Sequence, residues 1–209
     1  DERMGICGDS NEPCVTCGMK KACPGHYGYI QLVEPILHPL YYKEIASLLK
    51  CFCKKCHKLV LLRQQLDMSN ISKMSGVKKY KAILNKIEKT DICSHCQAPQ
   101  PKILFKPKDM TIVMEYKQKK DNKVSLQLSV DDIRKIFENV NDDQVRELGF
   151  DPEFVHPRNY IITVFPVIPP CSRPFVKTDG NVCDDDLTFQ LFEICKINHQ
   201  LRLLSAENN

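Results

Sequence analysis

Apolar residues recur at the interval of a helix in two parts of the chain. In the segment 41–50, Ile45, Leu48 and Leu49 fall on one stripe, which predicts an amphipathic helix. A second helix is predicted over Val77–Lys89, where one stripe is apolar and the opposite face is nearly all lysine. Both patterns are typical of helices that cover a hydrophobic core on one side.

Two strand-like runs lie in the middle of the chain. Thr111–Tyr116 and Val124–Leu128 are short and rich in β-branched and aliphatic residues. The segment 117–123 between them is polar and rich in lysine. This order predicts a β-hairpin.

Two short helices are predicted directly after the hairpin. Ser129 and Asp132 have the spacing of a capping box, which indicates a helix that runs to Asn139. Asn141 can cap a second helix, and Gly149 stands where that helix would end.

We also expect residues 1–40 to form a metal-binding turn followed by an extended segment.

The last third of the chain changes character several times. Tyr160–Phe165 predicts a strand, and the prolines within 166–174 predict a stiff, irregular, extended path. The loop Lys177–Cys183 contains a glycine and is expected to be mobile. Asp184–Asp186 precede the apolar run Leu187–Leu204, and negative charge there favours a helix start over a magnesium site.

The composition is that of an ordinary globular protein. Of 209 residues, 43% are hydrophobic and 27% are charged, which excludes wholesale disorder. No apolar run approaches the ~18 residues of a membrane span. The chain opens at Asp1 without a methionine and without a signal peptide, so we expect either processing or a piece of a longer protein.

Twelve cysteines are unusual for this length, and their spacing predicts metal binding. Two residues between ligands let a tight turn direct both side chains at one ion. This spacing, without a secretory signal, favours metal over disulfides and predicts a reducing, intracellular environment. The units with this spacing are the pairs Cys14/Cys17, Cys53/Cys56 and Cys93/Cys96, and Cys23 with His26.

The four units predict two structural zinc ions. One site would be local, and the other would close a long loop; both would be closed sites with four protein ligands and no catalytic position. Iron–sulfur ligation of the second site is the weaker alternative. Cys51 can substitute for Cys53 in principle, but Cys53 completes the repeated spacing. Cys7, Cys171, Cys183 and Cys195 are isolated and are expected to be free thiols.

The charge of the chain does not by itself indicate nucleic-acid binding. The formal net charge of +4 falls to about +1 once seven thiolates and two zinc ions are counted. A basic lobe nevertheless spans Lys50–Lys89, with only Asp67 and Glu88 as acids, and can orient a polyanion or form a solvated helix face. No phosphate-binding loop, nucleotide-binding glycine motif or nucleophile motif occurs. The residues alone therefore predict a zinc-stabilised, noncatalytic α+β module.

Several short motifs follow one another along nearly the whole chain. They are Asp1-Glu2-Arg3-Met4-Gly5, Cys23-Pro24-Gly25-His26, the two later cysteine pairs, Leu148-Gly149-Phe150, Phe165-Pro166-Val167-Ile168-Pro169-Pro170, Arg173-Pro174 and Asp185-Asp186-Leu187-Thr188. In this order, they resemble the N-terminal region of the largest subunit of multisubunit DNA-directed RNA polymerases of the eukaryotic, archaeal and large-DNA-virus type.

The resemblance implies a clamp segment that holds DNA and the RNA–DNA hybrid during transcription. Arg173 and Lys177 would lie in a lid-like loop near nucleic acid. The partners would be the other polymerase subunits, above all the second-largest, together with template DNA and the hybrid, and no membrane. The family's magnesium-binding catalytic motif is absent, so the 209 residues would be part of a longer nucleotidyltransferase subunit that binds Mg elsewhere.

The resemblance also implies a division into four parts and a location. The parts would be 1–40 with the first zinc knuckle and the clamp core, 41–100 with helices and the second zinc site, 101–165 with the strands and helices of the clamp head, and 166–209 with the proline-rich stretch, the lid-like loop and a helix. The location would be the nucleus for a cellular eukaryotic protein, and the cytoplasm or virion for a viral one.

Two alternatives use the same cysteines. A free-standing zinc-bearing module would bind DNA or RNA by itself with a steep salt dependence. A cross-braced domain of the ubiquitin-ligase type would combine Cys14 and Cys17 with a distal pair, although the intervals here are long and uneven for that arrangement.

Overall fold

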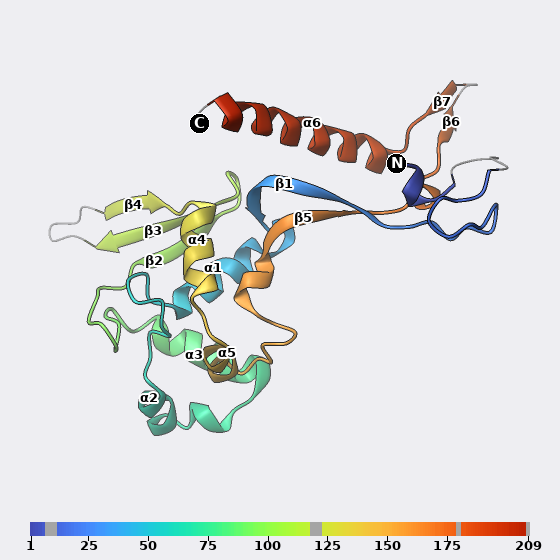
Figure 1. The fold of residues 1–209 in the computed structure, drawn as a ribbon. Helices are drawn as coiled ribbons and strands as arrows, with labels where there is room; N and C mark the ends of the chain where they lie inside the picture. The colour runs from blue at the N-terminus through green and yellow to red at the C-terminus, as the bar shows by residue number, and fades with distance from the viewer. Residues whose placement is uncertain (7–11, 118–122, 179–180, 208–209) are drawn as a thin grey trace. The chain divides into compact units, whose positions relative to one another are not determined.

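The computed structural model describes residues 1–6, 12–117, 123–178 and 181–207, and it combines helices with short strands (Figure 1). These residues form two compact units. The first contains 1–34 and 163–209, and the second contains 35–162. The chain passes from one unit to the other within two paired strands, β1 and β5. The predicted α+β class is confirmed, whereas the division into four parts stays a prediction.

The first unit carries one long helix and two pairs of strands. In β1, extended backbone follows the first metal-binding segment, as predicted. The elements are β1 (Gly28–Leu37), β5 (Ile161–Val167), the antiparallel hairpin of β6 (Val176–Thr178) and β7 (Asn181–Cys183), and α6 (Asp186–Glu207).

The second unit combines five helices with a three-stranded antiparallel sheet in the order β2-β3-β4. Short 3-10 turns join several of these elements. The helices are α1 (Tyr42–Cys51), α2 (Arg63–Met68), α3 (Gly76–Ile87), α4 (Val130–Glu138) and α5 (Asp142–Leu148), and the strands are β2 (Lys102–Lys106), β3 (Thr111–Lys117) and β4 (Lys123–Gln127).

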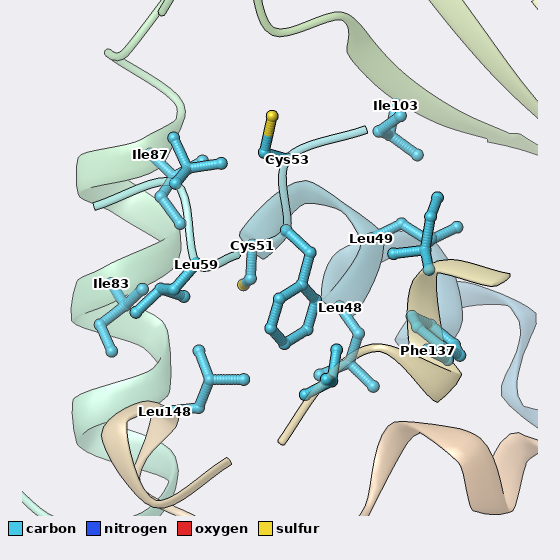
Figure 2. Close-up of a cluster of buried hydrophobic side chains, with 14 of the residues drawn as sticks. Leu48, Leu49, Cys51, Cys53, Leu59, Ile83, Ile87, Ile103, Phe137 and Leu148 are labelled. Atoms are coloured by element: carbon cyan, nitrogen blue, oxygen red, sulfur yellow. The ribbon is translucent and has the colours of Figure 1, made fainter. Parts of the chain in front are cut away.

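The hydrophobic core of the second unit forms where the apolar stripes of its helices meet. Figure 2 shows Leu49 of α1, Ile83 of α3, Phe137 of α4 and Leu148 of α5 gathered in this cluster. All four side chains are fully buried. Because each comes from a different helix, this cluster holds these four helices together.

The predicted helices of the second unit are confirmed to within two residues at each end. Ser129 caps α4 through a capping box with Asp132, as its spacing predicts. Asn141 caps α5 in the same way, and Gly149 follows that helix with φ 96°, in the left-handed region. The predicted hairpin is also confirmed, with β3 and β4 antiparallel.

Two predictions for the last third of the chain were wrong. Strand β5 continues through Pro166, although the prolines were expected to prevent regular structure. A two-stranded sheet has only edge strands, and an edge strand tolerates a residue that cannot donate a hydrogen bond. The predicted loop 177–183 contains the paired strands β6 and β7 instead. The sequence analysis also missed α2 and β2, which are only 6 and 5 residues long.

Candidate metal centres

The first candidate centre gathers Cys14, Cys17, Cys23 and His26, whose ligand atoms all lie within 4.8 Å of one another. The Cys17 and Cys23 Sγ atoms are 3.6 Å apart, and His26 Nε2 lies 3.5 Å from Cys23 Sγ. The backbone N–H of His26 donates to Met4 O, which anchors the second half of the centre to the start of the chain. All four ligands belong to the first unit.

The second candidate centre gathers Cys53, Cys56, Cys93 and Cys96 within the same 4.8 Å limit. The Sγ atoms of Cys53 and Cys96 are 3.5 Å apart, and those of Cys56 and Cys93 are 3.8 Å apart. The two pairs are 36 residues apart in sequence, since Cys56 and Cys93 flank 57–92. This centre therefore closes a long loop that contains α2 and α3.

One backbone arrangement recurs in all three C-x2-C turns. In each turn, the first cysteine O accepts a hydrogen bond from the residue four positions later, and its N–H donates to the O five positions later. The residue after the second cysteine has a positive φ in each case, so the chain turns back sharply. These residues are Gly18 (70°), His57 (58°) and Gln97 (57°).

Both groups fit a tetrahedral zinc ion. With Zn–S bonds of about 2.3 Å, two sulfurs of a tetrahedral site lie about 3.8 Å apart. The S···S distances of 3.5, 3.6 and 3.8 Å in the two centres are close to this value. The grouping is sequential, so the cross-braced alternative does not describe these sites. All described cysteines are free, as metal ligation requires.

Hydrogen-bond donors favour the thiolate form of Cys53. Burial raises the pKa of Cys53, but N–H groups of Cys56, Lys55 and Gln100 outweigh it and lower the pKa to about 6. The Gln100 Nε2 group donates to Cys53 Sγ at 3.3 Å. Sequence analysis missed Gln100, because no spacing rule links it to the cysteines. Burial raises the pKa of Cys56 to about 12, so a metal ion must displace its proton.

Cys51 is excluded from the second centre by its surroundings. Its side chain is fully buried, and its Sγ donates to Ser47 O at 3.7 Å, one turn back in α1. Burial raises its pKa to about 12. Lys54 Nζ donates to Leu49 O and Phe52 O, which joins the end of α1 to the cysteine turn. The choice of Cys53 over Cys51 thus agrees with the geometry.

The remaining cysteines are not brought together. Cys171, Cys183 and Cys195 are exposed, and Cys7 lies outside the described residues. Cys171 Sγ donates to Pro24 O at 3.3 Å, so this thiol lies against the first centre without belonging to the group of four. The prediction of isolated thiols holds for the three described residues.

Arg173, a predicted nucleic-acid contact, bonds within its own unit. Its Nε donates to Ile168 O at 3.2 Å, and its Nη1 donates to Thr188 Oγ1 at 2.8 Å. The second bond joins the two ends of the segment that contains the β6–β7 hairpin. Lys177 belongs to β6, and its side chain lies outside the described part of the structure.

The acidic triple is a helix start, as predicted. Asp186 is the first residue of α6, and Asp185 Oδ2 accepts from the N–H of Leu187 at 3.0 Å. Neither of the groups of metal-ligand type found among the described residues includes these carboxylates.

Only part of the basic lobe is available to a polyanion. Lys79 Nζ donates to Arg146 O, and Lys86 Nζ donates to Gln65 O and Ser69 Oγ. Lys78 and Lys81 of α3 are exposed instead. Of the lysines on α3, these two therefore offer the more accessible charges.

Comparisons with a family model and with individual proteins point to the same family. The family model described as RNA polymerase Rpb1, domain 1, matches residues 1–209. A probable DNA-directed RNA polymerase II subunit RPB1 homolog of Invertebrate iridescent virus 6 is 37% identical over 99% of this chain and 21% of its own length. The subunit RPB1-B of Trypanosoma brucei brucei is 31% identical over 92% of this chain and 13% of its own.

A similar protein also occurs in an archaeon. The DNA-directed RNA polymerase subunit Rpo1N of Sulfolobus acidocaldarius is 30% identical over 97% of this chain and 23% of its own. The chain thus spans less than a quarter of the length of these relatives. In the described part of the chain, no helix combines the length and the apolar character needed to cross a membrane.

Proposed function

Because the chain belongs to the family of RNA polymerase Rpb1, domain 1, we propose that it serves as a clamp segment that holds DNA and the RNA–DNA hybrid during transcription. The family match over the whole chain carries this proposal. The partners would be the remaining polymerase subunits, above all the second-largest, and template DNA with the hybrid. Nucleotide addition with Mg would take place on other parts of the enzyme.

The two metal centres would be structural zinc sites. Each offers four protein ligands, which fills a tetrahedral shell and leaves no position for a substrate. In the first unit, zinc would fix the start of the chain next to β1. In the second unit, zinc would hold both ends of the loop that contains α2 and α3. A clamp that closes on nucleic acid needs such rigid surfaces.

The β6–β7 hairpin is the best candidate for the lid-like contact with the hybrid. Apolar side chains in the hairpin and directly before it are exposed: Val182 of β7 and Phe175, which precedes β6, are both 60% accessible. The Arg173–Thr188 hydrogen bond holds the base of the hairpin. Aromatic and apolar side chains suit contacts with base faces of any sequence, as a polymerase requires.

A photo-crosslinking experiment tests this assignment. A photoreactive phenylalanine analogue replaces Phe175 in the assembled polymerase, which is halted on a labelled RNA–DNA scaffold. We expect crosslinks to RNA near the upstream end of the hybrid. Phe154, an aromatic of the second unit that is 76% exposed, carries the same analogue as the control. Crosslinks from position 175 to protein only would refute the lid-like role.

A further inference from the structure

The side chain of Asn198 bonds to strand β1 at two points. Its Oδ1 accepts from the backbone N–H of Val33 at 2.8 Å, and its Nδ2 donates to the backbone O of Gln31 at 2.9 Å. Asn198 lies in the middle of α6, and Figure 1 shows this helix running past β1. The contact thus joins parts of the first unit that are far apart in sequence.

This pair of bonds has the pattern of a parallel β-sheet. A residue in a parallel strand donates its N–H to the O of one neighbour residue and accepts from the N–H two residues further on. The carboxamide supplies the same donor and acceptor to Gln31 and Val33. A reversed amide would place donor against donor and acceptor against acceptor, so the two bonds also fix its orientation.

Helix α6 needs such an attachment because apolar burial does not supply one. Within its described side chains, Asp186–Glu207, none is buried. Strand β1 is bonded to β5 in a two-stranded sheet, so among the described strands none pairs with its second edge. An open edge is commonly covered by a helix or loop. The Asn198 side chain both attaches α6 and bonds to the open edge of β1.

We propose that Asn198 is a positioning residue, whose amide takes the place of one residue of a third strand and thereby fixes α6 on β1. This inference concerns the first unit itself and does not depend on the proposed clamp function. Gln31 also donates from its side-chain Nε2 to Thr163 O, at 3.3 Å, so the bonded stretch of β1 is held from the β5 side as well.

The test uses the full-length subunit in its assembled enzyme and hydrogen–deuterium exchange. In Asn198→Ala, we expect the Val33 amide to exchange about tenfold faster, because it loses its acceptor. Gln200→Ala, at an exposed position of the same helix, is the matched control and should leave Val33 unchanged. An unchanged Val33 amide in Asn198→Ala would overturn the proposal.

Asn198→Asp provides a second test that simple loss of packing cannot imitate. The ionised carboxylate still accepts from Val33 but faces the O of Gln31 without a donor. Once protonated, it regains the donor, so the protection factors of α6 should rise as the pH falls from 7 toward the usual carboxyl pKa of about 4. Asn198→Ala, measured at each pH, removes the contribution of other titrating groups. Equal pH dependence in the two variants would overturn the proposal, even if the alanine variant assembled poorly.

Discussion

Different interactions stabilise each of the two units of the chain. In the described part of the first unit, Cys14, Val167 and Pro169 are the only buried apolar residues. The second unit buries a continuous cluster from five helices and a sheet. If both centres bind zinc as proposed, the first unit would depend on its metal and on polar attachments such as Asn198, whereas the metal would only supplement the core of the second unit.

The two candidate metal centres also differ in where their ligands lie along the chain. The first centre takes its four candidate ligands from one short segment, in a unit that buries few apolar residues. The second centre joins two turns across a loop, and the buried Ile83 and Ile87 of that loop already pack in the core. Under the proposed function, metal would take the place of a core in the first unit and would close a loop in the second.

The largest difference between the two units is expected when the metal is removed. Structural zinc contributes roughly 10–16 kcal/mol in small zinc-dependent domains, so a chelator should remove the protection of residues 12–34. Amides of α1 and α4 should stay protected, because the core of the second unit remains. Hydrogen–deuterium exchange with and without chelator measures both regions. Simultaneous loss of protection in both units would contradict the difference described here.

Truncation of a core side chain should have the opposite effect, because it should destabilise the second unit and leave the first unit nearly unchanged. Phe137 is fully buried in the second unit, and Phe137→Ala should destabilise that unit by about 3–5 kcal/mol. The exchange of β1 residues in the first unit should change little. Phe154→Ala removes an exposed ring from the second unit and serves as the control. The result to look for is faster exchange in α1, α3 and α4 only.

Gly25 offers a smaller and more local change in the first unit. It has φ 80°, and an added Cβ would lie 2.6 Å from Pro169 Cβ and 2.5 Å from Cys171 Sγ. Gly25→Ala should therefore destabilise the first centre by about 1–3 kcal/mol, measured as faster zinc transfer to a chromogenic chelator. Gly18→Ala is the matched control, with φ 70° and no atom within 4 Å of an added Cβ. Equal effects would show that backbone strain alone, without the proline contact, accounts for the change.

The smallest expected effect is a pH dependence in the second unit. Burial, followed by the charge of Arg158, lowers the pKa of His156, whose Nδ1 accepts from the N–H of Arg158. The unfolded chain therefore takes up a proton more readily than the folded chain below about pH 6.5. Stability from this residue is complete above that pH and declines as the pH falls toward the lowered pKa. The local stability of α5, from exchange at several pH values, should depend less on pH in His156→Gln.

Sequence analysis predicted the features that local chemistry determines. The spacing of the cysteines identified both ligand groups, and the capping residues Ser129 and Asn141 located two helices within one residue. These signals lie within a few residues of the structure that they encode. Each therefore needs no knowledge of the rest of the fold.

Features that depend on contacts between distant segments were not predictable. Gln100 reaches Cys53 across 47 positions, and Asn198 reaches Val33 across 165. The positive φ of His57 and Gln97 is local, but it was missed because no glycine marks these positions. The continuation of β5 through Pro166 was not predictable either, because its partner β1 is far away in sequence.

The zinc content of the full-length subunit tests the central claim most directly. Elemental analysis should show a loss of one zinc ion in Cys23→Ser/His26→Ala and of one zinc ion in Cys93→Ser/Cys96→Ser, each relative to the unaltered subunit. Cys171→Ser/Cys195→Ser removes two cysteines outside both centres and should leave the zinc content unchanged. An unchanged zinc content in either of the first two variants would contradict the account of two sequential structural zinc sites.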